Sequence, residues 1–221
     1  MKIGLFGGTF NPIHIGHLRV AVEVKALFAL DKVYLIPAAL PPHKEPGGVS
    51  EAKDRMEMTR LAVSNLPDFI VSDVELNRSG PSYTIDTVLH FKSALPNNPR
   101  LYFILGLDAF LEIDTWKSYR KIFQLIPVIV MARPDTAYSD TTMMWETLEA
   151  YLKLNISDGY RFNLSDSCYV HDEMQPVHIV DVLPVDISST MIRKRINEGR
   201  SIHAMVPENV EDFITDRGLY L

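Results

Sequence analysis

The sequence predicts an α/β fold: a doubly wound, Rossmann-like parallel sheet with helices on both faces and further helices at the C-terminus. Two observations support this fold class. Apolar segments of strand length alternate with helical segments, which is typical of βαβ units and a parallel sheet. In addition, residues 7–17 and 187–193 are two strand-to-helix corners rich in glycine, histidine or hydroxyl residues. Ligands of such sheets bind beyond the carboxyl ends of the strands.

The apolar pattern predicts six strands, with helices between and after them. The strands are expected to start at Ile3, Val33, Phe69, Leu101, Pro127 and Val177. The helices are expected near 17–30, 51–65, 84–94, 118–125, 141–155, 189–198 and 207–217. Because the chain has 221 residues, 47% of them hydrophobic, it can form one substantial core. We therefore interpret 1–221 as a single domain.

The first corner is the segment GGTFNPIHIGH, residues 7–17. Gly7 and Gly8 allow the backbone to approach a ligand closely. The unpaired N–H groups and the dipole at a helix start favour anions. If the helix begins near Ile15, His14 and His17 can both point over its N-terminal end toward a phosphate chain. The glycine spacing fits neither a Walker loop nor the dinucleotide-binding fingerprint, so histidines carry this predicted phosphate site.

The second corner is ISSTMIR, residues 187–193, where a strand gives way to a helix. Its hydroxyl residues Ser188, Ser189 and Thr190 predict an N-cap. Arg193 lies one turn into the helix and can offer its planar set of donors to phosphate oxygens. The alternative is an ordinary serine-capped amphipathic helix with a solvated Arg193. The segment alone favours that alternative.

Four shorter segments between the corners also contain polar groups suited to a nucleotide. They are PPHK (41–44), SYTIDT (82–87), FILGLD (103–108) and TWKSY (115–119). Lys44 can reach a phosphate, the carboxylate of Asp108 can accept hydrogen bonds from a ribose, and Trp116 has a flat face for a ring. Plain alternatives exist: PPHK could be a polyproline turn, SYTIDT a helix cap and Trp116 a core residue.

The first corner resembles the G-x-F-x-P-x-H-x-G-H signature of the nucleotidylyltransferase superfamily, and the second resembles its ISSTxIR element. With the four middle segments and the C-terminal VPENVEDFI and GLY stretches, the chain resembles the bacterial nicotinate mononucleotide adenylyltransferases. The resemblance implies transfer of the adenylyl group of ATP to nicotinate mononucleotide. The products would be nicotinate adenine dinucleotide and pyrophosphate, a step in NAD biosynthesis.

The resemblance also implies roles for the matching residues. The catalytic groups would be His17 on the α-phosphate, and His14 and Arg193 on the departing pyrophosphate. The ATP site would further include Gly8, Thr9, Phe10, Lys44, Gly106, Asp108 and Ser188. Nicotinate mononucleotide would contact Thr84, Trp116 and Arg133. Mg²⁺ would arrive on the phosphates of ATP with few protein ligands, so no separate metal site is expected.

Composition narrows the classes of partner and location. The formal charge of −6 argues against nonspecific nucleic-acid binding, which rests on basic patches. The single cysteine, Cys168, cannot form an internal disulfide. The N-terminus is expected to be a core strand rather than a signal peptide, and no apolar run approaches the ~18 residues of a membrane span. We expect a cytoplasmic enzyme, and a homo-oligomer is compatible with the sequence.

Residues 134–176 depart from the family pattern and resemble an insertion. Cys168, His171 and Asp172 invite a metal site, but one cysteine with scattered histidines is far short of a closed zinc site. We expect a surface excursion or an oligomer contact there.

Other reactions remain alternatives. Nicotinamide mononucleotide could replace the acid as acceptor, and phosphopantetheine adenylyltransferases and cytidylyltransferases share both corners but not the middle segments. A nucleotide-binding module without turnover is the alternative outside enzymes, although the intact histidines and Arg193 argue against it.

Overall fold

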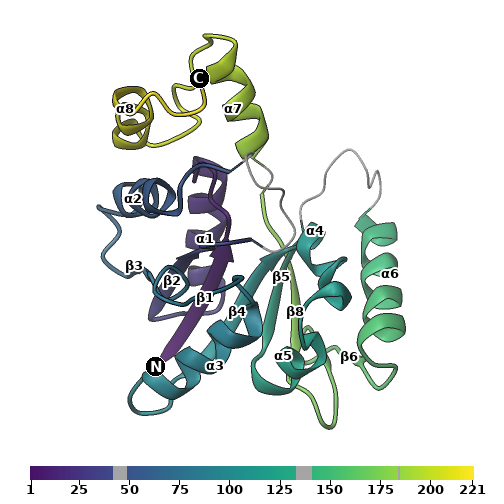
Figure 1. The fold of residues 1–221 in the computed structure, drawn as a ribbon. Coiled ribbons are helices and arrows are strands. Elements are labelled where there is room, and N and C mark those ends of the chain that lie inside the picture. Colours follow the sequence, from purple (N-terminus) through teal and green to yellow (C-terminus); the bar gives the residue numbers. More distant parts are fainter. Residues whose placement is uncertain (42–48, 133–140, 184) are drawn as a thin grey trace. The chain divides into compact units, whose positions relative to one another are not determined.

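The computed structural model describes residues 1–41, 49–132, 141–183 and 185–221, with only the backbone described over 141–144 (Figure 1). Within these residues eight strands are hydrogen-bonded into one sheet in the order β3-β2-β1-β4-β5-β8-β7-β6. Their bounds are β1 Lys2–Gly8, β2 Lys32–Pro37, β3 Phe69–Val71, β4 Arg100–Gly106, β5 Val128–Ala132, β6 Arg161–Asn163, β7 Cys168–Val170 and β8 Val177–Asp181. All six predicted strands are present, and each starts within one residue of its predicted start.

The predicted strands pair as a parallel sheet requires. Strand β2 is parallel to β3, β4 to β5, and β5 to β8. The chain runs from β1 to β2 and β3, and then continues with β4, β5 and β8 on the other side of β1. Every residue of β5 is buried, as expected for a parallel strand covered on both faces. The predicted doubly wound α/β fold is confirmed.

The chain divides into two compact units. Unit 1 comprises Met1–Gly4 and Tyr83–Pro184, and unit 2 comprises Leu5–Ser82 and Val185–Leu221. In unit 2 the helices are α1 Ile15–Leu27, α2 Ala52–Ala62, α7 Ser189–Asn197 and α8 Glu208–Asp216. Helix α1 begins at Ile15, two residues before the predicted range of 17–30, and buries Val20, Ala21 and Val24. Helices α2 and α8, far apart in the sequence, pack together within this unit (Figure 1).

Unit 1 contains the middle segments of the chain. Its helical elements are α3 Thr84–Ala94, α4 Leu107–Phe110, the 3₁₀ turn η1 Ile113–Thr115, α5 Tyr119–Leu125, α6 Thr141–Tyr151 and the π-helical turn η2 Leu152–Ile156. Helix α3 packs against α5. The completely buried side chains of Phe110, Ile113, Ile122 and Phe123 form the core beneath η1 and α5. The predicted helices 84–94 and 118–125 are thereby confirmed.

Residues 161–170 extend the sheet at its edge, and most of 161–167 is exposed at the surface. Strand β6 pairs antiparallel with β7, and β7 pairs antiparallel with β8, so the sheet is mixed and not purely parallel. Tyr160, Cys168 and Tyr169 are buried there. Strands of three residues give too short an apolar alternation to be recognised in a sequence. Tertiary pairing with β8 decides this part of the fold.

The structure gives the polar residues of this segment ordinary contacts. His171 accepts a hydrogen bond from the Glu173 N–H at its Nδ1 (2.9 Å), and its Nε2 lies 2.8 Å from Ser157 Oγ. Burial raises the pKa of the Cys168 thiol. Over the described residues there is no group of three or more His, Cys, Asp or Glu side chains placed to hold a metal. Nor is any helix in those ranges long and apolar enough to cross a bilayer.

Candidate active site

The turn between β1 and α1 is shaped by close packing on its glycines. A Cβ on Gly8 would lie 2.8 Å from the ring of Phe10, so only glycine allows this ring to fold back onto the strand end. Phe10 has a φ of +48°, which non-glycine residues rarely adopt, and its side chain is buried. Such strained residues are found where the surrounding structure fixes a functional geometry. Gly8 and Phe10 therefore fix the backbone that leads to the histidines.

The two histidines of the first corner have their rings in contact, tilted by 32° to each other. Their ring centroids are 3.7 Å apart, and the His14 N–H donates to His17 Nδ1 at 3.3 Å. Because Nδ1 of His17 accepts, the ring proton of a neutral His17 lies on Nε2, which becomes a donor. A Cβ on Gly16 would lie 3.0 Å from the His14 ring, which explains the glycine between the histidines. Phe10 meets the His17 ring edge-on at 5.2 Å.

The two rings differ in exposure. His14 is 2% exposed and caps α1 with its backbone, whereas His17 is half-buried. The sequence predicts that both rings face a phosphate chain; in this structure His17 has the more accessible ring of the two. The Ile15 N–H, one of the donors expected at the helix start, is bonded to the Met205 carbonyl at 3.0 Å.

Arg55 holds the backbone of the first corner, a structural role that the sequence does not reveal. It lies in α2, is 1% exposed, and donates to the carbonyls of Thr9 (2.8 Å), Ala38 (2.6 Å), Ala39 (3.2 Å) and Ser50 (3.0 Å). One buried guanidinium thus connects the β1–α1 turn, the end of β2 and the start of α2. Burial lowers the pKa of Arg55, and the four carbonyl dipoles offset part of the cost of burying the charge. The sequence does not indicate this role, because a buried and an exposed arginine of an amphipathic helix cannot be distinguished from the sequence pattern.

The second corner lies directly against the first. Ser188 caps α7, as predicted, by accepting from the Met191 N–H at 3.1 Å. Arg193 Nη1 donates to the Asn11 carbonyl at 2.8 Å, across 182 positions of chain. Ser189 Oγ donates to the neighbouring Pro12 carbonyl, also at 2.8 Å. The two motifs therefore lie against each other within unit 2.

The predicted pyridine-nucleotide residues lie in unit 1, on neighbouring elements. Trp116 follows η1, is half-buried and meets Phe103 edge-on at 6.2 Å. The adjacent Lys117 Nζ lies 3.2 Å from Asp86 Oδ2 and 4.5 Å from the ring centroid of Tyr83. Because Tyr83 and Asp86 flank Thr84 at the start of α3, Lys117 brings the loop of Trp116 to that helix start.

Two further predicted residues follow β4 in the same unit. Gly106 ends the strand and precedes the short helix α4, and Asp108 is exposed in the first turn of that helix. Lys44 and Arg133 lie outside the described residues.

Comparison with known proteins agrees with this geometry. The model of the cytidylyltransferase-like family matches residues 5–195, which include both corners. The chain belongs to this family. It is 45% identical over 223 residues to a probable nicotinate-nucleotide adenylyltransferase of Desulfatibacillum aliphaticivorans, covering 100% of both chains. A protein of the same name from Geobacter sulfurreducens is 40% identical, covering 100% of this chain and 98% of its own.

A solved structure has the same fold. The nicotinic acid mononucleotide adenylyltransferase of Plasmodium falciparum complexed with NaAD superposes with a TM-score of 0.73 at 20% identity, covering 99% of this chain and 97% of that one. The full-length relatives place the chain among the nicotinate-nucleotide adenylyltransferases of the cytidylyltransferase-like family.

In this family member, the C-terminus is also bonded to the first corner. Asn11 Oδ1 accepts hydrogen bonds from the Ser50 N–H (3.1 Å), the Ser50 hydroxyl (2.7 Å) and the Tyr220 hydroxyl (2.9 Å). Burial raises the pKa of Tyr220 to about 12, so its hydroxyl stays protonated. Asn11 therefore accepts a hydrogen bond from α7 at its backbone carbonyl and one from Tyr220, near the C-terminus, at its side chain.

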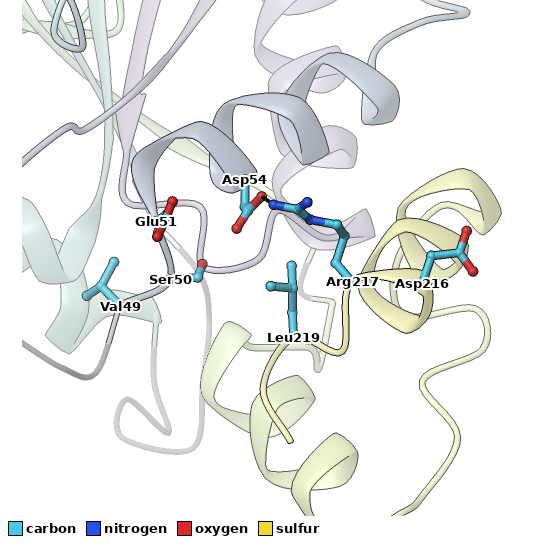
Figure 2. Close-up of a pocket in the computed structure, with 7 residues that line it drawn as sticks. All are labelled: Val49, Ser50, Glu51, Asp54, Asp216, Arg217 and Leu219. Carbon is cyan, nitrogen blue, oxygen red and sulfur yellow. Dashed lines mark hydrogen bonds and ion pairs between the residues drawn. The ribbon is translucent and has the colours of Figure 1, made fainter.

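An open cavity of about 560 Å³ lies next to this network (Figure 2). It is lined by Val49, Ser50, Glu51, Asp54, Asp216, Arg217 and Leu219. Arg217 crosses it to form an ion pair of 2.9 Å with Asp54. Apart from that ion pair the charged lining is acidic, which does not suit a phosphate. None of the predicted site residues that the structure describes lines this cavity.

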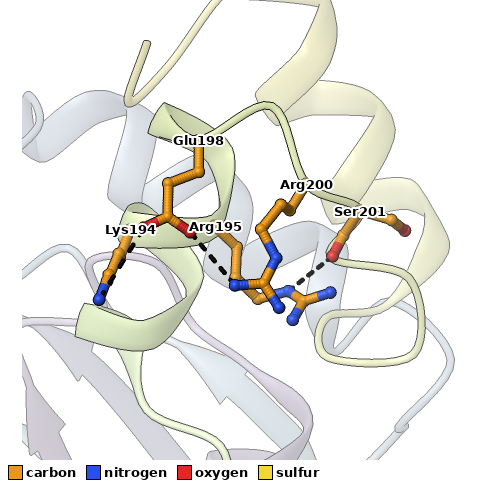
Figure 3. A network of polar contacts seen from close by, with 5 residues as sticks. All are labelled: Lys194, Arg195, Glu198, Arg200 and Ser201. Carbon is orange, nitrogen blue, oxygen red and sulfur yellow. Dashed lines mark hydrogen bonds and ion pairs between the residues drawn. The ribbon is translucent and has the colours of Figure 1, made fainter.

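The basic residues that follow Arg193 in α7 contact the C-terminal end of their own helix (Figure 3). Glu198 lies 3.9 Å from Lys194 and 3.2 Å from Arg200, and Arg195 Nε donates to the Ser201 carbonyl at 2.8 Å. Of the run 193–195, Arg193 is thus the residue bonded to the turn after β1.

Proposed function

We propose that this protein transfers the adenylyl group of ATP to nicotinate mononucleotide, releasing nicotinate adenine dinucleotide and pyrophosphate. The observation that carries the proposal is the hydrogen bond from Arg193 to the Asn11 carbonyl, because it brings the two corners, which are expected to bind phosphates, into contact. Full-length relatives named nicotinate-nucleotide adenylyltransferases support the acceptor, as do the middle segments around Thr84 and Trp116.

The chemistry requires few groups. The 5′-phosphate of the mononucleotide is a nucleophile at neutral pH, so it needs no general base and attacks the α-phosphorus of ATP in line, expelling pyrophosphate. Catalysis then rests on positioning and on stabilising negative charge. We assign His17 to the α-phosphate, because its Nδ1 accepts from the backbone and its Nε2 is the donor. His14, Lys44 and Arg193 are assigned to the departing pyrophosphate.

The remaining residues are assigned to binding. Phosphates and ribose of ATP would contact Gly8, Thr9, Phe10, Gly106, Asp108 and Ser188. The mononucleotide would contact Thr84, Trp116 and Arg133. ATP is expected to bind as its Mg²⁺ complex, with the ion held mainly by phosphate oxygens and water. Cytoplasmic location and oligomeric state stay predictions from the sequence.

The test is pyrophosphate release from ATP and Mg²⁺ with one acceptor at a time. Nicotinate mononucleotide is expected to be the best acceptor, with nicotinamide mononucleotide second and phosphopantetheine inactive. Replacing ATP by CTP is expected to abolish the signal. Efficient turnover with phosphopantetheine or CTP would contradict the proposal. Binding of ATP and mononucleotide without pyrophosphate release would instead indicate a nucleotide-binding module.

A further inference from the structure

The loop that carries Trp116 is fixed on both sides of the tryptophan by one short segment of unit 1. Before Trp116, the Tyr151 hydroxyl donates to Asp114 Oδ1 at 2.5 Å, and the Asp114 N–H donates back to that hydroxyl at 3.3 Å. After Trp116, the Tyr119 hydroxyl donates to the Asn155 carbonyl at 3.1 Å. Residues 151–155 thus hold positions 114 and 119, which flank the tryptophan.

The segment that makes these contacts is itself well anchored. Tyr151 ends α6, and its ring packs on Phe110 at 5.5 Å. Leu148 and Leu152, on either side of it, are completely buried. The π-helical turn η2 follows, and within it Asn155 Nδ2 donates to the Tyr151 carbonyl at 3.3 Å. Single π-helical turns are often found at functional sites.

The contact between Tyr151 and Asp114 has the features of a strong hydrogen bond. A donor–acceptor distance of 2.5 Å between a hydroxyl and a carboxylate is typical of a charge-assisted bond. Burial and the neighbouring carboxylate raise the pKa of Tyr151, so the hydroxyl keeps its proton. The second bond, from the Asp114 N–H, fixes the backbone of η1 as well as the carboxylate. Together these bonds limit rotation of the turn from which Trp116 projects.

We propose that Tyr151 is a positioning residue for the mononucleotide: its hydroxyl fixes the η1 turn so that the Trp116 ring is held ready for the pyridine ring. The proposal rests on the proposed function, and in particular on the role of Trp116 there. The proposal assigns a role in substrate selection to part of residues 134–176. The sequence indicates no role for this segment. Holding a binding group in place before the ligand arrives lowers the ordering cost of binding.

The experiment compares Tyr151→Phe with a matched control, Tyr160→Phe. Tyr160 lies in the same stretch of chain, is buried, and donates its hydroxyl to the Gln175 carbonyl at 2.9 Å. For Tyr151→Phe we expect the KM for nicotinate mononucleotide to rise about 3- to 10-fold, a typical effect of one lost hydrogen bond. The kcat and the KM for ATP are expected to stay within about twofold. Tyr160→Phe is expected to leave both KM values unchanged.

A second readout follows the loop directly, without turnover. The chain has two tryptophans, Trp116 and Trp145, so a Trp145→Phe parent reports Trp116 alone. In that parent, Tyr151→Phe is expected to make Trp116 fluorescence more accessible to acrylamide quenching, and Tyr160→Phe is not. Asp114→Ala is expected to reproduce both effects of Tyr151→Phe. Asp114→Asn retains a carbonyl acceptor and is expected to restore most of the wild-type behaviour.

Trp116→Ala separates failure of this inference from failure of the proposed function. If Trp116→Ala raises the KM for the mononucleotide while Tyr151→Phe changes neither that KM nor the quenching, the role of Tyr151 is wrong and the function stands. If the wild type releases no pyrophosphate, the proposed function fails, and unchanged quenching in Tyr151→Phe would overturn the positioning role as well. Equal increases of both KM values in Tyr151→Phe would indicate a general structural role and overturn the proposal.

Discussion

The corner around the histidines and the loop around Trp116 are held in place by different kinds of contact. In the histidine corner, the charged groups bind backbone: Arg55 contacts four carbonyls and Arg193 contacts that of Asn11. At the Trp116 loop, two pairs of side chains, Lys117 with Asp86 and Tyr151 with Asp114, contribute beside bonds to backbone groups.

This difference has consequences for each region. Carbonyl groups are present whatever the side chains are, so the corner depends on a few arginines, glycines and histidines. Its fixed backbone suits stabilisation of charge in a transition state, which requires donors already in place. The Trp116 loop depends on pairs in which both members must be present. Its Asp86–Lys117 pair is also partly exposed, so it contributes less stability than a buried contact.

The largest expected effect tests whether the corner acts in the chemical step. His17→Ala is expected to lower kcat about 10²- to 10³-fold, the usual cost of removing one transition-state donor. The fold should be retained, as judged by circular dichroism. The matched control is His90→Ala, at an exposed histidine of α3. Wild-type turnover in His17→Ala would remove this residue from the mechanism.

The next effect tests whether the corner depends on carbonyl contacts. Arg55→Met keeps the length of the side chain but leaves four carbonyls without their donor, so the free energy of unfolding is expected to fall by about 3 kcal/mol or more. Arg60→Met serves as the control, because Arg60 lies in the same helix with its side chain 52% exposed. The control should change stability by less than about 0.5 kcal/mol. Urea unfolding measures both, and equal losses would show that the carbonyl contacts contribute little.

A smaller effect tests whether the Trp116 loop serves the mononucleotide alone. Trp116→Ala is expected to raise the KM for nicotinate mononucleotide about 5- to 30-fold, corresponding to about 1–2 kcal/mol of ring stacking. The KM for ATP should change less than about twofold. Steady-state kinetics with each substrate varied in turn measures the difference. Equal losses for both substrates would assign Trp116 to the core of unit 1.

The smallest effect concerns the start of α7. Ser188→Ala removes the hydroxyl that accepts from the Met191 N–H, and is expected to cost about 1 kcal/mol of unfolding free energy. Ser93→Ala is the control, since its hydroxyl donates to the exposed His90 carbonyl at the end of α3. A loss in Ser188→Ala no larger than in the control would show that the cap contributes nothing to stability.

Much of the fold and part of the site follow from local sequence. The helix after the first corner and a hydroxyl cap at the start of α7 were predictable, because each depends on residues that are close together in the sequence. The antiparallel strands around Tyr169 were not, since their pairing with β8 depends on distant residues. The sequence also predicted that the rings of His14 and His17 both point toward a phosphate chain, whereas the fold buries the ring of His14 against Gly16 and leaves His17 half-buried.

The sequence by itself determined the alternation of strands and helices, the two corners, and the family to which the chain belongs. Periodicity and fixed motifs are local properties, because both depend on residues that are close together in the sequence. Only the tertiary structure decided that Arg193 bonds to Asn11, that Arg55 is buried beneath the first turn, and that Tyr151 fixes the loop of Trp116. These contacts join residues far apart in the chain, and most of them end on carbonyl oxygens, which every residue carries and which therefore leave no mark in a sequence.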